Sequence, residues 1–308
     1  MKRYLIVLLC LLLLTGCAPE KTNAEGYSFT DDTGELVTVP EKPETVAVLL
    51  SSLADLWITA GGTVDITVGE SVDRGFVPET AILVDAGAGK TIDLEGLIAA
   101  EPDFVLYSAD LSGQLECADA LKNAGIPAAG FTVETFEDYL RVLKISTDIL
   151  GFPENYARYG LSVQAEIEDM TAKALAQKNQ PDILFVRAGS SARFTKAKTA
   201  ENHFVCGMLK DLGTHNIAEK APVLLDGLST EEILLSDPDF ILFTTMGDEA
   251  AGQSYMQSLL QDPVWQTLTA VKEGRVYQLP KELFQYKPNA RWDEAYAYLI
   301  ELLYGDIL

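Results

Sequence analysis

Residues 94–106 read LEGLIAAEPDFVL, and residues 230–242 read TEEILLSDPDFIL, so the two segments align without a gap. In each segment an apolar helical pattern ends before Pro-Asp, because proline cannot continue a helix, and a short apolar run follows as a buried strand. Glu95 matches Glu231, and Phe104 matches Phe240. Equivalent helix–strand units in the two halves of the chain indicate a molecule with two related lobes.

Both segments lie within a longer alternation of strand and helix patterns. The first half predicts strands at 46–50, 65–68, 104–107 and 128–133, with helices at 53–60, 94–100 and 115–123. The second half predicts strands at 182–186, 240–243 and 276–279, with helices at 204–212, 255–260 and 292–304. Strands that alternate with helices form parallel sheets, so we expect two Rossmann-like α/β lobes at 27–150 and 181–308.

The segment between the predicted lobes carries a helical pattern and little strand signal. Pro153 suits the first turn of a helix, and Ile167, Met170 and Ala174 continue one apolar face. We therefore expect one long connecting helix within 151–180, about 39 Å in length. A stiff connection of this kind argues against large hinge closure.

The N-terminus resembles an export signal. Lys2 and Arg3 precede an apolar run at 5–14 that is too short to span a bilayer, and Cys17 follows directly after Thr15 and Gly16. This order resembles a bacterial lipobox, which predicts removal of residues 1–16, diacylation of Cys17 and a short tether at 17–26. The membrane is then a partner through the lipid anchor alone.

The composition narrows the class of protein. The 308 residues include 46 acids and 23 bases, a formal charge of −23, and the charge becomes −25 once Lys2 and Arg3 leave with the signal. Apolar residues make up 48% of the chain, which is enough for packed cores and excludes a disordered chain. Nucleic acid is excluded as a partner, because phosphate contacts need clustered lysine and arginine.

The chain as a whole resembles the class III substrate-binding proteins of bacterial ABC importers. The resemblance rests on the opening segment 29–46, the two repeated segments, residues 262–277, and 281–292, which reads KELFQYKPNARW. It implies a rigid two-lobed metal-chelate receptor joined by a backbone helix. The implied ligand is a ferric siderophore, with haem or cobalamin as alternatives, and the receptor has no cofactor of its own and no enzymatic activity. The last segment resembles a subgroup from anaerobic Gram-positive bacteria, which favours a Gram-positive surface.

The resemblance also implies how the receptor meets its transporter. Members of this family dock through one glutamate on each lobe onto arginines of the permease dimer, which a cytoplasmic ATPase drives. By position these residues are Glu95 and Glu231, although the neighbouring Glu232 is an alternative to Glu231. Two carboxylates on two lobes can form charge-assisted contacts with a two-fold receptor. We expect the protein itself to be a monomer.

Ligands of open α/β sheets bind beyond the carboxyl ends of the strands, which selects candidate loops. In the first lobe these loops carry Ser51, Ser52, Arg74 and Ser108, and in the second they carry Arg187, Arg193, Lys196, Lys198 and Met246. The basic loop at 187–198 is unusual in so acidic a chain. It predicts a positively charged lip for an anionic ligand, such as a chelate that bears carboxylates or catecholates, or a haem propionate.

Direct metal chelation and catalysis are the competing readings. The chain has only two histidines, His203 and His215, whereas zinc or manganese sites need several converging ligands. A receptor for a free divalent metal and a surface-anchored hydrolase stay open as alternatives, although no Gly-x-Ser-x-Gly elbow is present. Cys117 and Cys206 fall in different predicted lobes, so we expect free buried thiols there.

Overall fold

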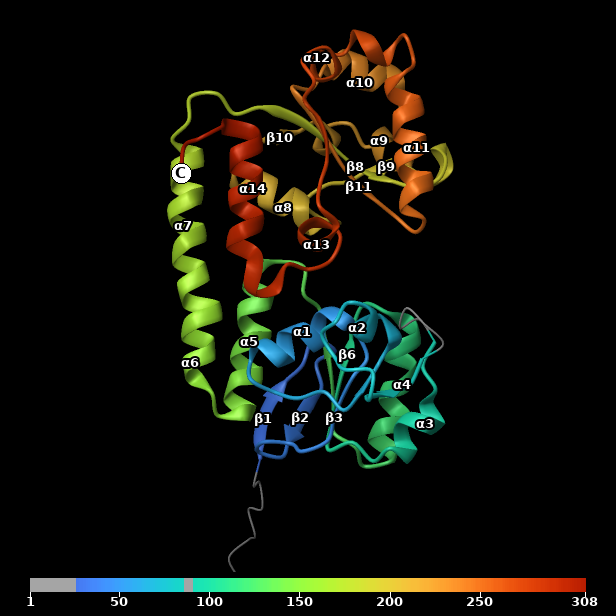
Figure 1. Cartoon of the computed structure of the whole chain (residues 1–308), viewed down its shortest axis with the longest axis vertical. Helices are drawn as coiled ribbons and strands as arrows, with labels where there is room; N and C mark the ends of the chain where they lie inside the picture. The colour runs from blue at the N-terminus through green and yellow to red at the C-terminus, as the bar shows by residue number, and fades with distance from the viewer. Residues whose placement is uncertain (1–25, 86–90) are drawn as a thin grey trace, which may run out of the picture.

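The computed structural model describes residues 26–85 and 91–308, and it consists of two α/β lobes beside a column of helices (Figure 1). Cys17 and the predicted signal and tether lie outside the described residues, apart from Gly26. No helix within the described ranges is both long and apolar enough to cross a bilayer. The predicted two-lobed α/β architecture is confirmed.

The N-terminal lobe is built on a parallel sheet with the strand order β5-β4-β3-β6-β7. An antiparallel hairpin, β1–β2, packs beside this sheet. The strands are β1 (Tyr27–Thr30), β2 (Leu36–Val39), β3 (Val46–Val48), β4 (Ile66–Thr67), β5 (Ile82–Leu83), β6 (Phe104–Ser108) and β7 (Ala128–Phe131). The helices are α1 (Ser51–Thr59), α2 (Gly69–Asp73), α3 (Leu94–Ala99), α4 (Ser112–Asn123) and α5 (Phe136–Leu150).

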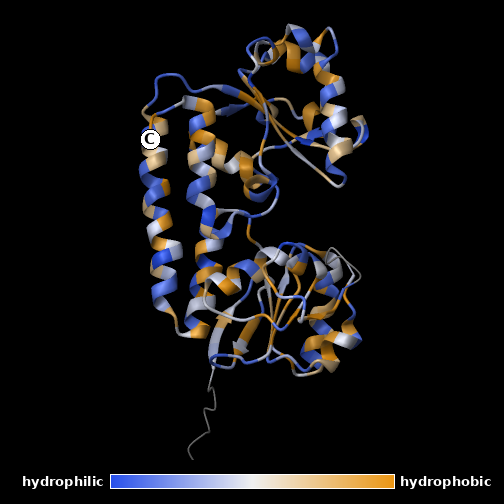
Figure 2. Cartoon of the chain, viewed as in Figure 1, coloured by the Kyte–Doolittle hydropathy of each residue, from blue (hydrophilic) through white to orange (hydrophobic). Residues whose placement is uncertain are grey.

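The C-terminal lobe repeats this plan with the strand order β10-β8-β11-β12, and a short strand β9 pairs antiparallel with β8. Its strands are β8 (Asp182–Ala188), β9 (Lys196–Ala197), β10 (His215–Asn216), β11 (Phe240–Thr245) and β12 (Val276–Gln278). Its helices are α8 (Phe204–Asp211), α9 (Val223–Asp226), α10 (Thr230–Ser236), α11 (Glu249–Leu260), α12 (Thr269–Lys272), α13 (Lys281–Phe284) and α14 (Trp292–Tyr304). Figure 2 shows that the central strands of both sheets are largely hydrophobic, as expected for strands covered on two faces.

The repeated sequence segments form equivalent structures. In α3–β6 and in α10–β11 the helix is followed by a residue with positive φ, Glu101 at 48° and Asp237 at 40°. The next aspartate then fastens the neighbouring strand: the Asp103 carboxylate accepts from the backbone N–H of Thr45, and Asp239 accepts from that of Asp182, each at 2.9 Å. The Pro-Asp-Phe signature therefore sets strand register in both lobes.

The connection between the lobes is helical but not a uniform α-helix. It consists of α6 (Pro153–Tyr156), a π-helical turn (Ala157–Leu161) and α7 (Ser162–Leu175). The helix ends at Leu175, short of the 180 expected from the sequence, because its buried apolar face stops at Ala174 and residues 177–180 are all polar. α14 packs along α7, so this column of helices runs beside both lobes (Figure 1).

Candidate ligand-binding site

A cavity of about 530 Å³ lies between the two lobes. Its N-terminal wall comes from α1, α2 and the residues just after α2, on the side of that lobe that faces the C-terminal lobe (Figure 1). Its C-terminal wall comes from α13 and the segment before α14. The lining residues are Asp55, Asp73, Arg74 and Phe76 on one side, and Lys281, Glu282, Tyr286, Lys287, Pro288, Ala290 and Arg291 on the other.

Arg74 is the predicted ligand residue that lines this cavity. Its Nη1 donates to Ser51 Oγ at 2.9 Å, and Ser51 Oγ in turn donates to Glu70 Oε2 at 2.9 Å. The guanidinium lies 3.7 Å from the ring centre of Tyr286 and 4.5 Å from that of Phe76. Burial lowers the pKa of Arg74, while the Glu70 carboxylate favours its charged form. Arg74 is thus stacked between an aromatic ring of each lobe.

The C-terminal wall also fastens the lobes to each other. Asn289 is buried with φ of 51°, and its Nδ2 donates to Ser52 O and to Asp55 Oδ2, each at 2.8 Å. The Lys287 Nζ forms an ion pair with Glu134 of the N-terminal lobe at 2.9 Å. The segment from Tyr286 to Asn289 is therefore both a wall of the cavity and the clasp between the lobes, a role that its sequence alone did not suggest.

Three basic side chains gather beside this clasp, and we call Arg187, Lys196 and Lys198 the basic cluster. Arg187 on β8 is paired directly with Lys196 on β9, and the Lys198 N–H donates to Phe185 O. Paired residues of antiparallel strands project from the same face of a sheet, so the three side chains share one face. Burial lowers the pKa of Lys198, and the charges of Arg187 and Lys196 lower it further. Among the described residues no carboxylate forms an ion pair with any of the three.

His203 connects the basic cluster to the clasp. Its ring lies 4.7 Å from Phe185 and 5.2 Å from Phe204, centre to centre, and Lys287 Nζ lies 4.4 Å from the Phe204 ring centre. Its Nδ1 accepts from the backbone N–H of Val205 at 3.3 Å and caps α8. Burial, with the nearby charges of Lys287, Arg187 and Lys198, lowers the pKa of His203 to about 3. A neutral, helix-capping histidine has a structural function here.

The other predicted ligand residues have different environments. Ser108 is buried; its N–H donates to Gln114 Oε1, and its Oγ accepts from the Asp110 N–H. Met246 is half-buried after β11, where its N–H donates to Ala188 O. Arg193 is exposed on a 3₁₀ turn, with its guanidinium 5.6 Å from the centre of the Phe194 ring. The structure thus separates Arg193 from the face that carries the basic cluster.

The two predicted docking glutamates occupy equivalent helical positions. Glu95 is exposed in the first turn of α3, and Glu231 is exposed in the first turn of α10. Each is the second residue of its helix. Glu232 is half-buried, and its N–H donates to the capping Ser229 Oγ at 3.4 Å. In Figure 1 α3 and α10 lie on the side of the molecule away from α7, one on each lobe.

Within the ranges the structure describes, no group of three or more His, Cys, Asp or Glu side chains is arranged to hold a metal ion. Cys117 and Cys206 are both free and buried, and burial raises the pKa of each thiol. Their separation into different lobes agrees with the sequence prediction.

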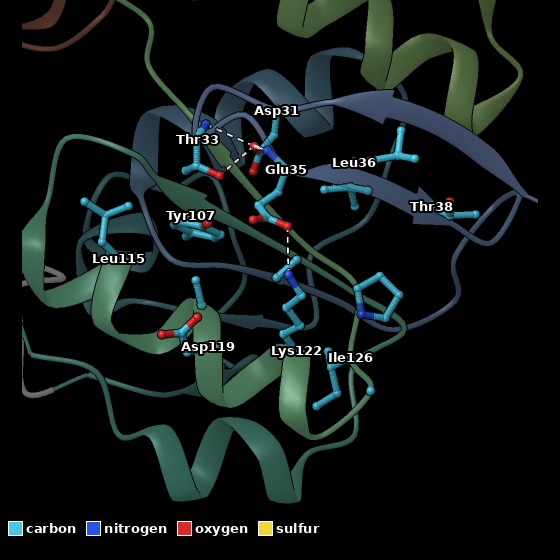
Figure 3. A pocket seen from close by; sticks show the side chains of 15 residues that line it. Asp31, Thr33, Glu35, Leu36, Thr38, Tyr107, Leu115, Asp119, Lys122 and Ile126 are labelled. Carbon is cyan, nitrogen blue, oxygen red and sulfur yellow. Dashed lines mark hydrogen bonds and ion pairs between the residues drawn. The ribbon is translucent and has the colours of Figure 1, made fainter.

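Another cavity, of about 430 Å³, lies on the N-terminal lobe between the β1–β2 hairpin and α4 (Figure 3). The exposed ion pair between Lys122 Nζ and Glu35 Oε2, 2.8 Å long, crosses it, and Tyr107 lines it. Burial raises the pKa of the Tyr107 phenol. None of the predicted ligand-binding residues borders this cavity, so the site between the lobes is the better candidate.

Comparison with known proteins finds one matching family and several relatives that are named as binding proteins. A family model described as periplasmic binding protein matches residues 46–283. YhfQ of Bacillus subtilis (strain 168), named as an ABC transporter substrate-binding lipoprotein, is 22% identical over 98% of this chain and 97% of its own length. The vitamin B12-binding protein of Pectobacterium carotovorum is 24% identical over 67% of this chain and 73% of its own. The structure of Staphylococcus aureus SirA complexed with staphyloferrin B shares the fold, with a TM-score of 0.69 at 17% identity over 90% of this chain and 98% of that one.

Proposed function

The chain belongs to the periplasmic binding protein family, and we propose that it is the extracytoplasmic receptor that captures a metal chelate and delivers it to an ABC import permease. Membership of a binding-protein family makes it a receptor and not an enzyme. The relatives that bind vitamin B12 or staphyloferrin B support a chelate as the ligand class. A ferric siderophore is the first candidate, and haem and cobalamin are the others.

One observation carries the proposal: the cavity between the lobes is walled by both of them, and positively charged side chains line it or adjoin it. Arg74, Lys281, Lys287 and Arg291 contribute to the walls, and the basic cluster adjoins Lys287 through His203. Pockets at the junction of two lobes, with a few convergent polar groups, are the usual place for small ligands. An anionic chelate held there would contact both lobes at once.

We propose that Glu95 and Glu231 dock the loaded receptor onto the permease. Both side chains are exposed and carry a negative charge at the start of a helix, one on each lobe. Two separated carboxylates suit a two-fold receptor with a basic group on each subunit, because charge complementarity orients the encounter. Neither glutamate lines the cavity between the lobes, so docking and capture would use different residues.

We also propose that Cys17 is lipidated and holds the receptor on the outer face of the cell membrane, with a Gram-positive surface favoured. The order of basic residues, apolar run, small residues and cysteine supports this, and so does the name of the relative YhfQ. Cys17→Ser should release the chain from membranes into the soluble fraction. Retention of the variant in the membrane fraction would contradict the lipid anchor.

The transport experiment uses cells that carry the receptor and its permease, with a radiolabelled ferric chelate as substrate. Glu95→Ala with Glu231→Ala should leave chelate affinity unchanged and abolish uptake, because docking fails while capture persists. Glu232→Ala is the matched control and should transport normally. Normal uptake by the double variant would refute the docking residues, and normal uptake by cells without the receptor would refute the function.

A further inference from the structure

We propose that the chelate keeps a net negative charge after it has bound its metal, and that its anionic oxygens lie against the basic cluster of Arg187, Lys196 and Lys198. The inference rests on the proposed receptor function and specifies its ligand class. Carboxylate and catecholate chelates of iron belong to this class, because oxygens that are not neutralised by the metal leave the complex anionic. Ferric tris-hydroxamates, which are neutral or cationic, do not belong to it.

The geometry of the basic cluster is the first support. Arg187 lies at the carboxyl end of β8, where α/β folds bind ligands, and its register partner on β9 is Lys196. Phe185 and Arg187 alternate with Leu184, Val186 and Ala188 along β8, and Phe185 belongs to the core that faces α8 and α14. The basic cluster therefore projects from the same face as Phe185, beside His203 and the clasp between the lobes.

The second support is that no described acid forms an ion pair that would offset the positive charge of the basic cluster. Three partly buried cations on neighbouring strand positions repel one another, and like charges placed directly opposite destabilise a sheet. The chain has 46 acids against 23 bases, so partners are abundant, yet none of the described acids forms an ion pair with these three side chains. Glu134 instead pairs with Lys287. Uncompensated positive charge at a candidate site is what an anionic ligand would neutralise.

The third support is the asymmetry of the site. On the N-terminal side, Arg74 is already engaged by Ser51, Glu70 and the ring of Tyr286, and Asp55 and Asp73 add negative charge. The free positive charge is therefore concentrated on the C-terminal lobe. A chelate with its anionic oxygens toward β8 and β9, and its less charged part toward α1 and α2, would match this distribution. The opposite orientation would place anions against Asp55 and Asp73.

The test measures binding of defined chelates to the full-length chain purified in detergent. The panel contains a ferric tris-catecholate, ferric citrate, ferrioxamine B as a cationic hydroxamate complex, haemin and cyanocobalamin. Tryptophan fluorescence reports binding, because Trp292 lies next to Phe204 and the clasp, with ring centres 5.7 Å apart. We expect a negatively charged member of the panel, which is the catecholate complex, the citrate complex or haemin with its propionates, to bind most tightly. Its affinity should fall as salt is raised, since salt screens charge attraction.

Substitutions then locate the effect. Lys196→Gln or Lys198→Gln should weaken the anionic chelate by about tenfold each, and the double variant by about a hundredfold, which corresponds to the loss of one charge-assisted contact per residue. Lys178→Gln, an exposed lysine near the end of α7, is the matched control and should change nothing. The melting temperature of each ligand-free variant is the second measurement. Because each substitution relieves repulsion, the melting temperature should stay the same or rise while affinity falls.

The outcomes separate two kinds of failure. Tightest binding by ferrioxamine B or cyanocobalamin, neither of which carries a net negative charge, or unchanged affinity in the double variant, would overturn the ligand class and leave the receptor function standing. Saturable binding by no member of the panel would overturn the receptor function and the ligand class together. A lower melting temperature with unchanged affinity would show that the three side chains only support the sheet, and would also overturn the proposal.

Discussion

Acid should destabilise this protein through His203, and the size of the effect follows from its environment. The unfolded chain takes up a proton at an imidazole pKa of about 6.5. In the folded chain, burial and the charges of Lys287, Arg187 and Lys198 lower the pKa of His203 to about 3. Between these values the unfolded state binds one more proton than the folded state, so stability falls as the pH falls. The loss is about 1.4 kcal/mol per pH unit, or about 2 kcal/mol at pH 5 relative to pH 7.

The perturbation that isolates this effect is His203→Asn. Asparagine also caps helices, so it can replace the acceptor of the Val205 N–H, but it cannot bind a proton in this range. Urea unfolding at pH 7 and at pH 5 gives the acid-induced loss for each protein. We expect that loss to be about 2 kcal/mol smaller in the variant than in the natural chain. Protonation of carboxylates affects both proteins and cancels in the comparison.

His215→Asn is the matched control. His215 is exposed on β10, outside the contacts that surround His203, so this variant should keep the acid sensitivity of the natural chain. Equal acid-induced losses in the natural chain and in the His203 variant would refute the assignment of His203 as a neutral structural residue. That result would reopen a ligand-binding role for its imidazole.

Three further substitutions test how the fold positions the site. Asn289→Ala should lower the free energy of unfolding by about 2–4 kcal/mol, because it leaves Ser52 O and the half-buried Asp55 carboxylate without their donor. A loss below about 1 kcal/mol in denaturant titration would contradict the role of the clasp in holding the lobes together. Asp239→Ala should cost about 1.5–3 kcal/mol by removing the carboxylate that accepts from the Asp182 N–H, and unchanged stability would disprove its part in strand register. Tyr139→Phe should cost about 1 kcal/mol, because its hydroxyl donates to a carbonyl of the π-helical turn at 2.9 Å, and calorimetry showing no change would rule that contact out.

Periodicity and the repeated segment were sufficient to predict the two lobes. The pattern at 292–304 coincides with α14, and the Pro-Asp-Phe units mark β6 and β11. α5 was not predicted, although Thr135 and Asp138 form a capping box at its start and could have revealed it. The π-helical turn has no sequence signature in a helical pattern that continues through it.

The site was harder to predict, because its geometry depends on contacts between distant segments. The sequence suggested that Arg193 and Lys196 lie together in one basic loop. In the structure, the pairing of β8 with β9 puts Arg187, Lys196 and Lys198 on one face of the sheet, and Arg193 is exposed on a turn. The clasp is even harder to predict from the sequence. Nothing local in the segment before α14 indicates that Asn289 reaches residues of α1 more than 230 positions earlier in the chain.

One titration addresses the receptor function and its ligand class together: fluorescence of the full-length chain with each chelate of the panel and with bare divalent metal ions. The structure predicts saturable one-to-one quenching by a negatively charged ferric chelate, and loss of that quenching when Arg187, Lys196 and Lys198 are all replaced by glutamine. Quenching by a bare divalent ion, with no response to any chelate, would contradict capture of a chelate between the lobes.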